Sequence, residues 1–311
     1  MKKKLIENVR YLIAILLVAS IAVFLLKNKD KLELLYNINF MYCFLLLPCV
    51  FLTHLVGSAN LFVLLKAKHQ KLVWIKWIGF HLVKRFMNMH LPQSGNVYEA
   101  IKMKEKFGID TFCYVSSFGA VNWFNACLNC FISFVLLLGW SGGGGQKNMF
   151  VIGGLLLLLI ILIVVPLSLD FLFLHARKCS FPGTFDRYVA TAHQLVRSMR
   201  EDIMDVRIFP RLLLWNILLF CVSTVSLFLG FRTLDVHVEL NVLIPFVALN
   251  SMVALVSILP SNIGITEYAF GFLGDALNLA MTIGILLSLL FRLLTYVVFL
   301  ATYFLTTIKL R

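Results

Sequence analysis

The chain has 311 residues, of which 60% are hydrophobic and only 14% are charged. Roughly a quarter of the residues in soluble domains are charged, so this composition excludes an ordinary soluble domain and predicts an all-α polytopic integral membrane protein. A net charge of +13 is also typical of nucleic-acid-binding proteins, but in a chain this apolar it indicates orientation in the membrane and attraction to anionic lipid. We therefore expect no nucleic-acid partner.

The N-terminal segment is basic up to Arg10 and apolar from Tyr11 to Leu26. We interpret it as a retained first membrane helix. A cleaved signal peptide is the alternative, because Ser20-Ile21-Ala22 resembles a cleavage site. A charged link over 27–37 leads into a second predicted span at about 40–65.

Residues 66–106 combine two properties that rarely occur together. Nine Lys and Arg residues exclude an ordinary span, whereas the apolar residues of 72–91 exclude a solvated loop. Pro92 then ends any helix that reaches it. We predict a helix that enters from the cytoplasmic face, breaks at Pro92 and returns from Asn96 to Phe107. An amphipathic helix lying on the membrane surface is the alternative.

The middle of the chain predicts spans at 110–140 and 149–174, joined by a glycine-rich loop that lacks the spacing of a phosphate-binding P-loop. Cys127 and Cys130 have the spacing of a metal or redox pair. No second pair and no nearby histidine accompany them, so we interpret them as small core residues. We expect neither a metal nor a cofactor.

Residues 175–211 are basic, and apolar residues recur with helical spacing from Phe185 to Val206. This pattern predicts an interfacial helix at about 182–207 that serves as a cytoplasmic connector. Spans at 212–231 and 281–307 follow, and a second broken helix pair is expected between them.

The second break lies at Pro260. Proline stops the preceding apolar helix, and Gly264 is a suitable N-cap for a new one, because Glu267 three residues later can reach back to the exposed N–H groups. Broken helices of this kind line the substrate sites of transporters.

The break occurs twice in the chain. Residues 91–99 align without gaps with residues 259–267, so that Pro92 matches Pro260, and Glu99 matches Glu267. We predict two inverted repeats, at about 40–140 and 210–308, with six full spans and two oppositely oriented broken pairs in a single membrane domain.

The basic residues indicate an orientation. With both termini, 66–106 and 175–211 placed inside, 22 of the 28 Lys and Arg residues are cytoplasmic. Such a bias is typical of the cytoplasmic side, so we predict a multi-pass protein of the cell (plasma or inner) membrane with both termini in the cytoplasm.

Two motifs resemble a known family. Ser257-Ile258-Leu259-Pro260-Ser261-Asn262-Ile263-Gly264-Ile265-Thr266-Glu267 and Leu290-Phe291-Arg292-Leu293-Leu294-Thr295-Tyr296 resemble the lysylphosphatidylglycerol synthase transmembrane family, also called the flippase-like domain family. The segment 91–100 resembles its first-half motif. That family often has an Asp at position 96 or 97 and an Arg in the following span, where this chain has Asn96 or Val97 and then Asn122, Trp123 and Asn125.

The resemblance implies a module that translocates lipid. Because the chain ends at Arg311 without the soluble aminoacyl-transfer domain of some relatives, we expect no lipid-modifying chemistry and hence no enzyme. The expected substrate is an anionic phospholipid or a lipid-linked headgroup. A homo-oligomer or a lipid-modifying enzyme is the possible protein partner.

Arg292 is the first candidate for the phosphate, because it stays charged at membrane depth and helix N-termini at Asn96 and Gly264 would assist it. It could instead pair with Glu267 or Asp275. Glu99 and Glu267 could bind a cationic headgroup or a coupling proton, or could only cap their helices. The candidate substrate-binding residues are Arg292, Glu267, Asn262, Glu99, Asn96, Arg85 and Tyr296, and the candidate turn residues are Pro92, Gly95, Pro260 and Gly264.

Two other functions remain open. The chain could be a membrane enzyme of a glycosyl or aminoacyl transfer pathway, or an accessory subunit that binds lipid-linked substrates without moving them. Against an enzyme, the sequence has no HExxH, no GxSxG and no Asp-rich metal motif.

Overall fold

A computed structural model describes residues 19–24, 26–27, 38–91, 93–140, 146–176, 183–255 and 262–310 of the chain, and it contains helices and no strand in these ranges. The all-α prediction is therefore confirmed. The helices are α2 (Phe40–Lys68), α3 (Trp74–His90), α4 (Ser94–Phe107), α5 (Thr111–Trp140), α6 (Gln146–Ala176), α7 (Gly183–Met204), α8 (Phe209–Thr233), α9 (Leu240–Leu255), α10 (Ile265–Ala276) and α11 (Met281–Leu310).

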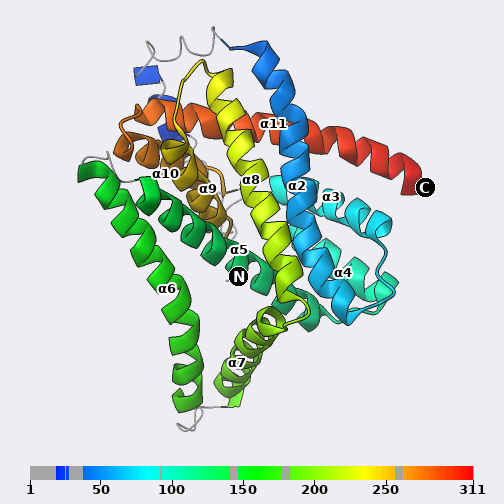
Figure 1. Ribbon diagram of the computed structural model, residues 1–311. Helices are drawn as coiled ribbons and strands as arrows, with labels where there is room; N and C mark the ends of the chain where they lie inside the picture. Colours follow the sequence, from blue (N-terminus) through cyan, green and yellow to red (C-terminus); the bar gives the residue numbers. More distant parts are fainter. Residues whose placement is uncertain are drawn as a thin grey trace.

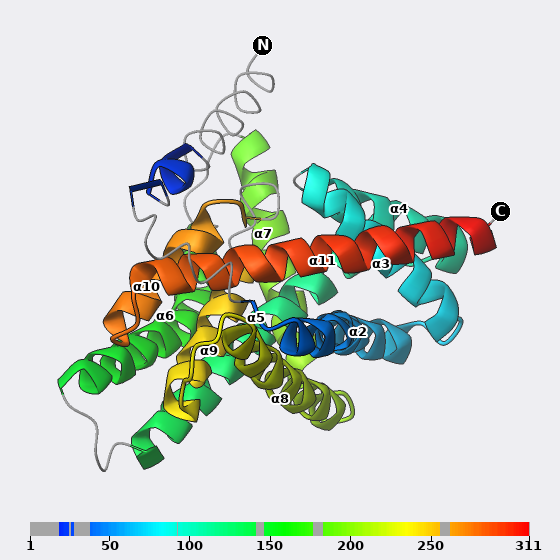
Figure 2. The ribbon, with the colours of Figure 1, turned by 90° about the horizontal axis from the view of Figure 1, so that it is seen from above.

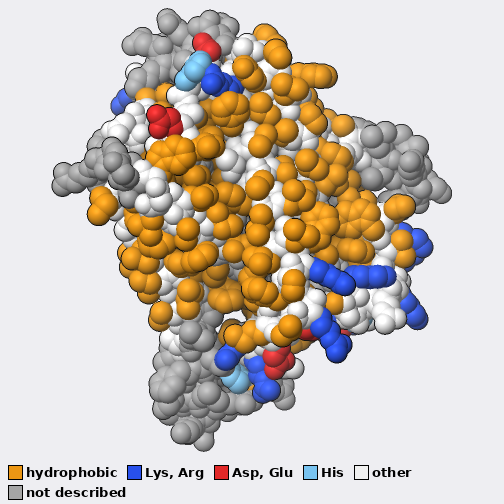
Figure 3. Space-filling model, in the orientation of Figure 1, with side chains coloured by type: hydrophobic (Ala, Val, Ile, Leu, Met, Phe, Trp, Pro, Cys, Tyr) orange, Lys and Arg blue, Asp and Glu red, His pale blue; other side chains and the backbone are white. Residues whose placement is uncertain are grey.

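Four helices are long and apolar enough to cross a membrane: α2, α5, α8 and α11. They coincide with four of the six predicted spans. In α6 the apolar stretch among the described residues is the shorter Met149–Val164. Most of the predicted first span lies outside the described residues. Figure 3 shows hydrophobic side chains over the middle of one face, with Lys and Arg gathered toward the end where α2 finishes and α8 begins. The chain is an all-α polytopic membrane protein.

Helices α2 and α8 form a central antiparallel pair (Figure 1). The Asn39 N–H donates to the Thr233 carbonyl at 3.0 Å, and the Asn216 amide donates to Asn60 Oδ1 at 3.0 Å. The start of α2 thus contacts the end of α8, and a later part of α2 contacts an earlier part of α8. The two helices therefore run in opposite directions.

The two short helix pairs begin at opposite ends of this central pair. The α3–α4 pair follows the C-terminal end of α2, and the α9–α10 pair follows the C-terminal end of α8 (Figures 1 and 2). Each pair also packs against the long helix of the other half, because α11 packs on α3 and α5 packs on α9. The division of the chain into repeats at about 40–140 and 210–308 stays a prediction.

Two glycines allow the backbones of neighbouring helices to touch. A Cβ on Gly95 would overlap the carbonyl oxygen of Lys84, where α4 meets α3. A Cβ on Gly284 would overlap the carbonyl oxygen of Phe270, where α11 meets α10. Any other residue at these positions would force the helices apart.

The first break differs from its prediction. The sequence pattern placed the N-cap at Asn96, but α4 begins at Ser94 and its N-cap is Gln93, which has a φ of 63°. The Ser94 hydroxyl donates to the Leu91 carbonyl at 2.9 Å, which closes the turn. The prediction of Asn96 as N-cap was therefore wrong, because the left-handed residue at 93 starts the helix three residues earlier.

The second break agrees with its prediction where it is described. Gly264 is the N-cap of α10 with a φ of 86°, and its N–H donates to Glu267 Oε2 at 2.7 Å. Asn262, also at positive φ (52°), precedes it. Pro92 and Pro260, the predicted break points, lie outside the described residues.

Helix α7 was predicted as a peripheral connector, and its last turns pack firmly on α5. The Asp202 carboxylate, 6% exposed, accepts a hydrogen bond from the Ser117 hydroxyl at 3.1 Å and forms an ion pair with Lys68. The Ser198 hydroxyl donates to the Ser116 hydroxyl at 3.2 Å. One end of α7 is thus fixed to the helical body.

Replacing Asp202 with asparagine is expected to lower the thermal unfolding midpoint of the purified protein, because it removes the buried charge that pairs with Lys68. Such a charged hydrogen bond contributes about 2 kcal/mol. The control is Arg197→Gln, which removes only an exposed pair with Glu201, and exposed pairs contribute about 0–1 kcal/mol. If both variants unfold at the same temperature, α7 is not held through Asp202.

Candidate functional site

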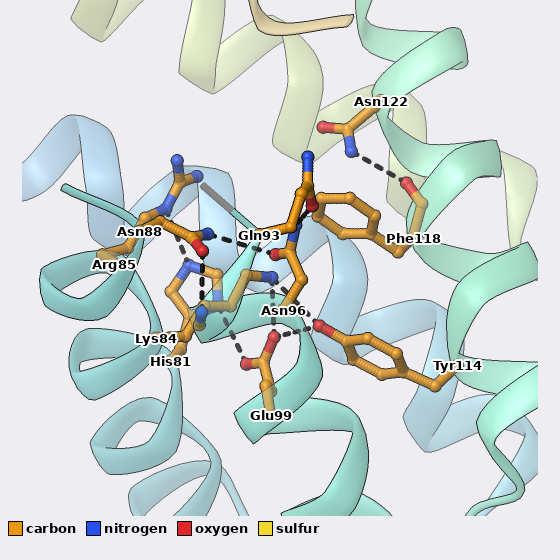
Figure 4. A network of polar contacts seen from close by, with 11 residues as sticks. His81, Lys84, Arg85, Asn88, Gln93, Asn96, Glu99, Tyr114, Phe118 and Asn122 are labelled. Atoms are coloured by element: carbon orange, nitrogen blue, oxygen red, sulfur yellow. Dashed lines mark hydrogen bonds and ion pairs between the residues drawn. The ribbon is translucent and has the colours of Figure 1, made fainter. Parts of the chain in front are cut away.

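A polar cluster lies where α3 and α4 meet α5 (Figure 4). The helix α3 is mostly apolar, yet His81, Lys84, Arg85 and Asn88 follow one another at spacings of three, one and three residues. Residues three and four apart share one side of a helix, so these four side chains converge. Glu99 of α4 and Tyr114 of α5 meet them there.

Glu99 is the centre of this cluster and is fully buried, at 0% exposure. Its carboxylate contacts Lys84 Nζ at 2.6 Å and His81 Nδ1 at 3.2 Å, and it also accepts a hydrogen bond from the Tyr114 hydroxyl. Three donors from two other helices therefore satisfy it. Glu99 joins α3, α4 and α5, and it does not cap its own helix.

Lys84 is equally enclosed. Besides Glu99 it donates to the Tyr114 hydroxyl at 3.1 Å, and its ammonium lies 4.3 Å from the centre of the Phe118 ring, close enough for a cation–π contact. The charge of Lys84 is thus neutralised inside the cluster.

Arg85 has a different environment. Its Nε donates to His81 Nε2 at 3.3 Å, and no carboxylate of the described ranges pairs with it. In Figure 4 the guanidinium points away from Glu99, with the His81 ring between them. The side chain is half-buried. Glu99 attracts Arg85 electrostatically but forms its ion pair with Lys84, so Arg85 adds a second positive charge to a cluster that has one carboxylate.

The protonation states follow from the surroundings of α3 and α4, which are not among the spanning helices. Burial lowers the pKa of His81 to about 4, although Glu99 opposes this shift. Burial alone would raise the pKa of Glu99, but the charges of Lys84 and His81 outweigh it and lower the pKa to about 2. At neutral pH His81 is therefore neutral and Glu99 is ionised.

The neutral imidazole has one proton, and its contacts fix where that proton lies. His81 Nε2 accepts from Arg85, so Nδ1 carries the hydrogen and donates to Glu99. With Lys84 and Arg85 positive and Glu99 negative, the cluster has a net charge of one positive unit. It is suited to an anion.

Asn88 holds the first break in place. Its Oδ1 accepts from the Gly95 N–H at 2.8 Å, and its Nδ2 donates to Asn96 Oδ1 at 3.3 Å. Asn96 in turn donates to the Gln93 side chain. The predicted residue Asn96 therefore lies at the cluster, where it belongs to the turn.

At the second break the carboxylate also has an internal partner. Glu267 is 1% exposed, and its Oε1 contacts Arg292 Nη2 at 2.6 Å and Nε at 2.8 Å. The partner of Arg292 among the two predicted carboxylates is Glu267, and the exposed Asp275 is not bonded to it. The Arg292 side chain as a whole retains 23% exposure.

The other predicted site residues link the breaks to their surroundings. The Asn262 amide donates to the Val253 carbonyl at 2.8 Å and so joins α9 to the start of α10. The Tyr296 ring lies 5.9 Å from the His90 ring, which joins α11 to the end of α3. Sequence reasoning missed His81, Lys84, Asn88 and Tyr114. The helical spacing of polar residues within apolar 72–91 was the signal for the first three.

Comparison with known proteins gives one result. The model of the family described as "Lysylphosphatidylglycerol synthase TM region" matches residues 11–302, which confirms the resemblance found in the motifs. No curated protein and no solved structure matches the chain significantly.

Proposed function

Because the chain belongs to the family of lysylphosphatidylglycerol synthase transmembrane regions, we propose that it moves a phosphate-bearing lipid between the two leaflets of the membrane. One observation carries this proposal: the buried cluster of α3, α4 and α5 has an excess positive charge at Arg85. A cation in such a place is costly unless an anion compensates for it.

A phosphate suits Arg85 better than other anions. The guanidinium presents parallel N–H donors that match two phosphate oxygens, and it keeps its charge at every physiological pH. The lipid chains of the substrate would lie along the apolar outer faces of the helices. Arg85 thus replaces Arg292, the first candidate predicted from the sequence, as the proposed phosphate ligand.

Arg292 keeps a secondary role in this proposal. Glu267 already neutralises its charge, so Arg292 would attract a substrate phosphate less strongly than Arg85. The contact between Tyr296 and His90 brings the α11 segment of Arg292 against α3. We assign Arg292 mainly to holding the second break.

The proposed activity is transport without chemical change of the lipid, in the plasma or inner membrane. The end of the molecule rich in Lys and Arg in Figure 3 would face the cytoplasm, where anionic lipid attracts basic residues. An enzyme or accessory subunit of a lipid-modifying pathway is the competing proposal.

Vesicles that contain the purified protein and no other protein test the proposal. The lipid probe is phosphatidylglycerol with a fluorescent NBD group on its acyl chain, and dithionite bleaches only the probe in the outer leaflet. We expect bleaching to exceed the share seen in protein-free vesicles. If the two shares are equal while the protein is folded and inserted, the transport proposal is wrong.

A further inference from the structure

A row of asparagines on α5 continues from the cluster toward the other side of the molecule. Asn122, Asn125 and Asn129, called here the α5 amide row, are spaced by three and four residues and so share one face of the helix. Tyr114 and Phe118, which contact Lys84, precede them on the same face. Figure 4 shows Asn122 one turn beyond Phe118.

The α5 amide row lies within a helix that is long and apolar enough to cross a membrane. From Asn122 to Asn129 the helix rises about 10 Å, which is roughly a third of the hydrocarbon thickness of a bilayer. Amide side chains at that depth are costly unless a partner satisfies them.

Bonding between helices does not account for the row. The Asn122 amide donates to the Phe118 carbonyl at 3.0 Å and the Asn129 amide donates to Asn125 Oδ1 at 3.1 Å, both within α5. Asn129 is only 3% exposed, and its Oδ1 has no hydrogen-bond partner in the described part of the chain. Asn129 Oδ1 is therefore a buried hydrogen-bond acceptor without a donor among the described residues.

Another asparagine pair shows what bonding between helices looks like here. Asn216 of α8 donates to Asn60 of α2, and both residues are almost fully buried. That pair holds two spanning helices together. Asn216 Oδ1 also lacks a partner, but Asn216 is bonded to another helix through its Nδ2. No amide of the row forms a bond to another helix among the described residues, so we take a ligand as the explanation for the row.

We propose that the α5 amide row binds the hydroxyl groups of an anionic lipid headgroup, a glycerol or sugar, whose phosphate is held by Arg85. This inference rests on the transport function proposed above. Hydroxyls donate to amide oxygens and accept from amide N–H groups, so the uncharged row pairs with them in either direction. Once its phosphate leaves Arg85, a headgroup passing along the row would exchange one amide for the next.

The carboxylates argue against an amine-bearing headgroup. A headgroup ammonium needs an acidic partner in a buried site. Glu99 is satisfied by Lys84, His81 and Tyr114, and Glu267 is satisfied by Arg292 and the Gly264 N–H. The site thus selects a hydroxyl headgroup over an amine headgroup of the same size.

The test compares two anionic probes in the vesicle assay. NBD-phosphatidylglycerol carries headgroup hydroxyls, and NBD-phosphatidic acid carries the phosphate alone. We expect the natural protein to move the first about tenfold faster, since one neutral hydrogen bond changes an equilibrium by about that factor. In the variant Asn125→Leu with Asn129→Leu, which keeps the side-chain size, both probes should move at the slower rate.

The outcomes separate this inference from the function on which it rests. If the natural protein moves neither probe, the transport proposal fails. If it moves both probes equally fast, or if the double variant keeps the preference, transport stands and the amide row is not a headgroup site.

Two further variants guard against loss of folding. The control Asn60→Leu with Asn216→Leu removes both members of the bonded pair and should keep the preference for phosphatidylglycerol. The single variant Asn122→Leu changes a half-buried residue and should reduce the preference several-fold in a folded protein. An unchanged preference in a folded Asn122→Leu protein would overturn the inference.

Discussion

Replacing Arg85 with glutamine is expected to abolish lipid movement in vesicles and to leave the protein folded. A bidentate guanidinium–phosphate contact contributes about 3 kcal/mol, or roughly a hundredfold in affinity. Folding should survive, because no described carboxylate loses its partner when this charge is removed. The Arg85→Lys variant keeps the charge without the parallel donors, so we expect an intermediate rate.

The matched control for Arg85 is Lys76→Gln, which removes an exposed charge from the same helix. Its rate should equal that of the natural protein. Unfolding midpoints of both variants separate a defect in transport from a defect in folding. A folded Arg85→Gln protein that moves lipid at the natural rate would remove Arg85 from the site.

Replacing Arg292 with glutamine is expected to have the opposite effect, with a large loss of stability. The change leaves the Glu267 carboxylate buried without its cation, and breaking a buried pair in this way costs about 3–5 kcal/mol. Yield and unfolding midpoint in detergent measure the loss. The second change Glu267→Gln should restore much of it, because the neutral amide oxygen can still accept from the Gly264 N–H.

Asp275→Asn provides the control for this pair, since Asp275 is exposed and forms no ion pair with another described residue. We expect no change in its unfolding midpoint. An Arg292→Gln protein as stable as the Asp275→Asn protein would show that the pair with Glu267 contributes little, and Arg292 would return to the list of phosphate ligands.

The sequence predicted those features that depend on neighbours in the chain. The capping of α10 follows from two residues three apart, and both Gly264 and Glu267 behave as expected. The long apolar helices follow from hydropathy. The start of α4 was placed wrongly because N-cap propensity favours Asn96. The helix instead starts after Gln93, whose backbone is left-handed.

Contacts between segments far apart in the chain could not be predicted from local sequence patterns. The partner of Arg292 stayed open because 25 residues and a turn separate it from Glu267, and only the packing of α10 on α11 decides the matter. The basic residues Lys84 and Arg85 were counted toward orientation in the membrane. Their different environments become visible only when Glu99 and Tyr114 are brought beside α3.

The close approach at Gly95 determines which parts of this protein can slide. The backbones of α3 and α4 touch there, so neither helix can shift along the other without collision. The boundary between α3 and α11 includes the tilted contact between the His90 and Tyr296 rings, and no backbone contact as close as that at Gly95 is found there among the described glycines. If the proposed transport opens the cluster to either leaflet, α3 and α4 must therefore move together as one rigid unit relative to α11.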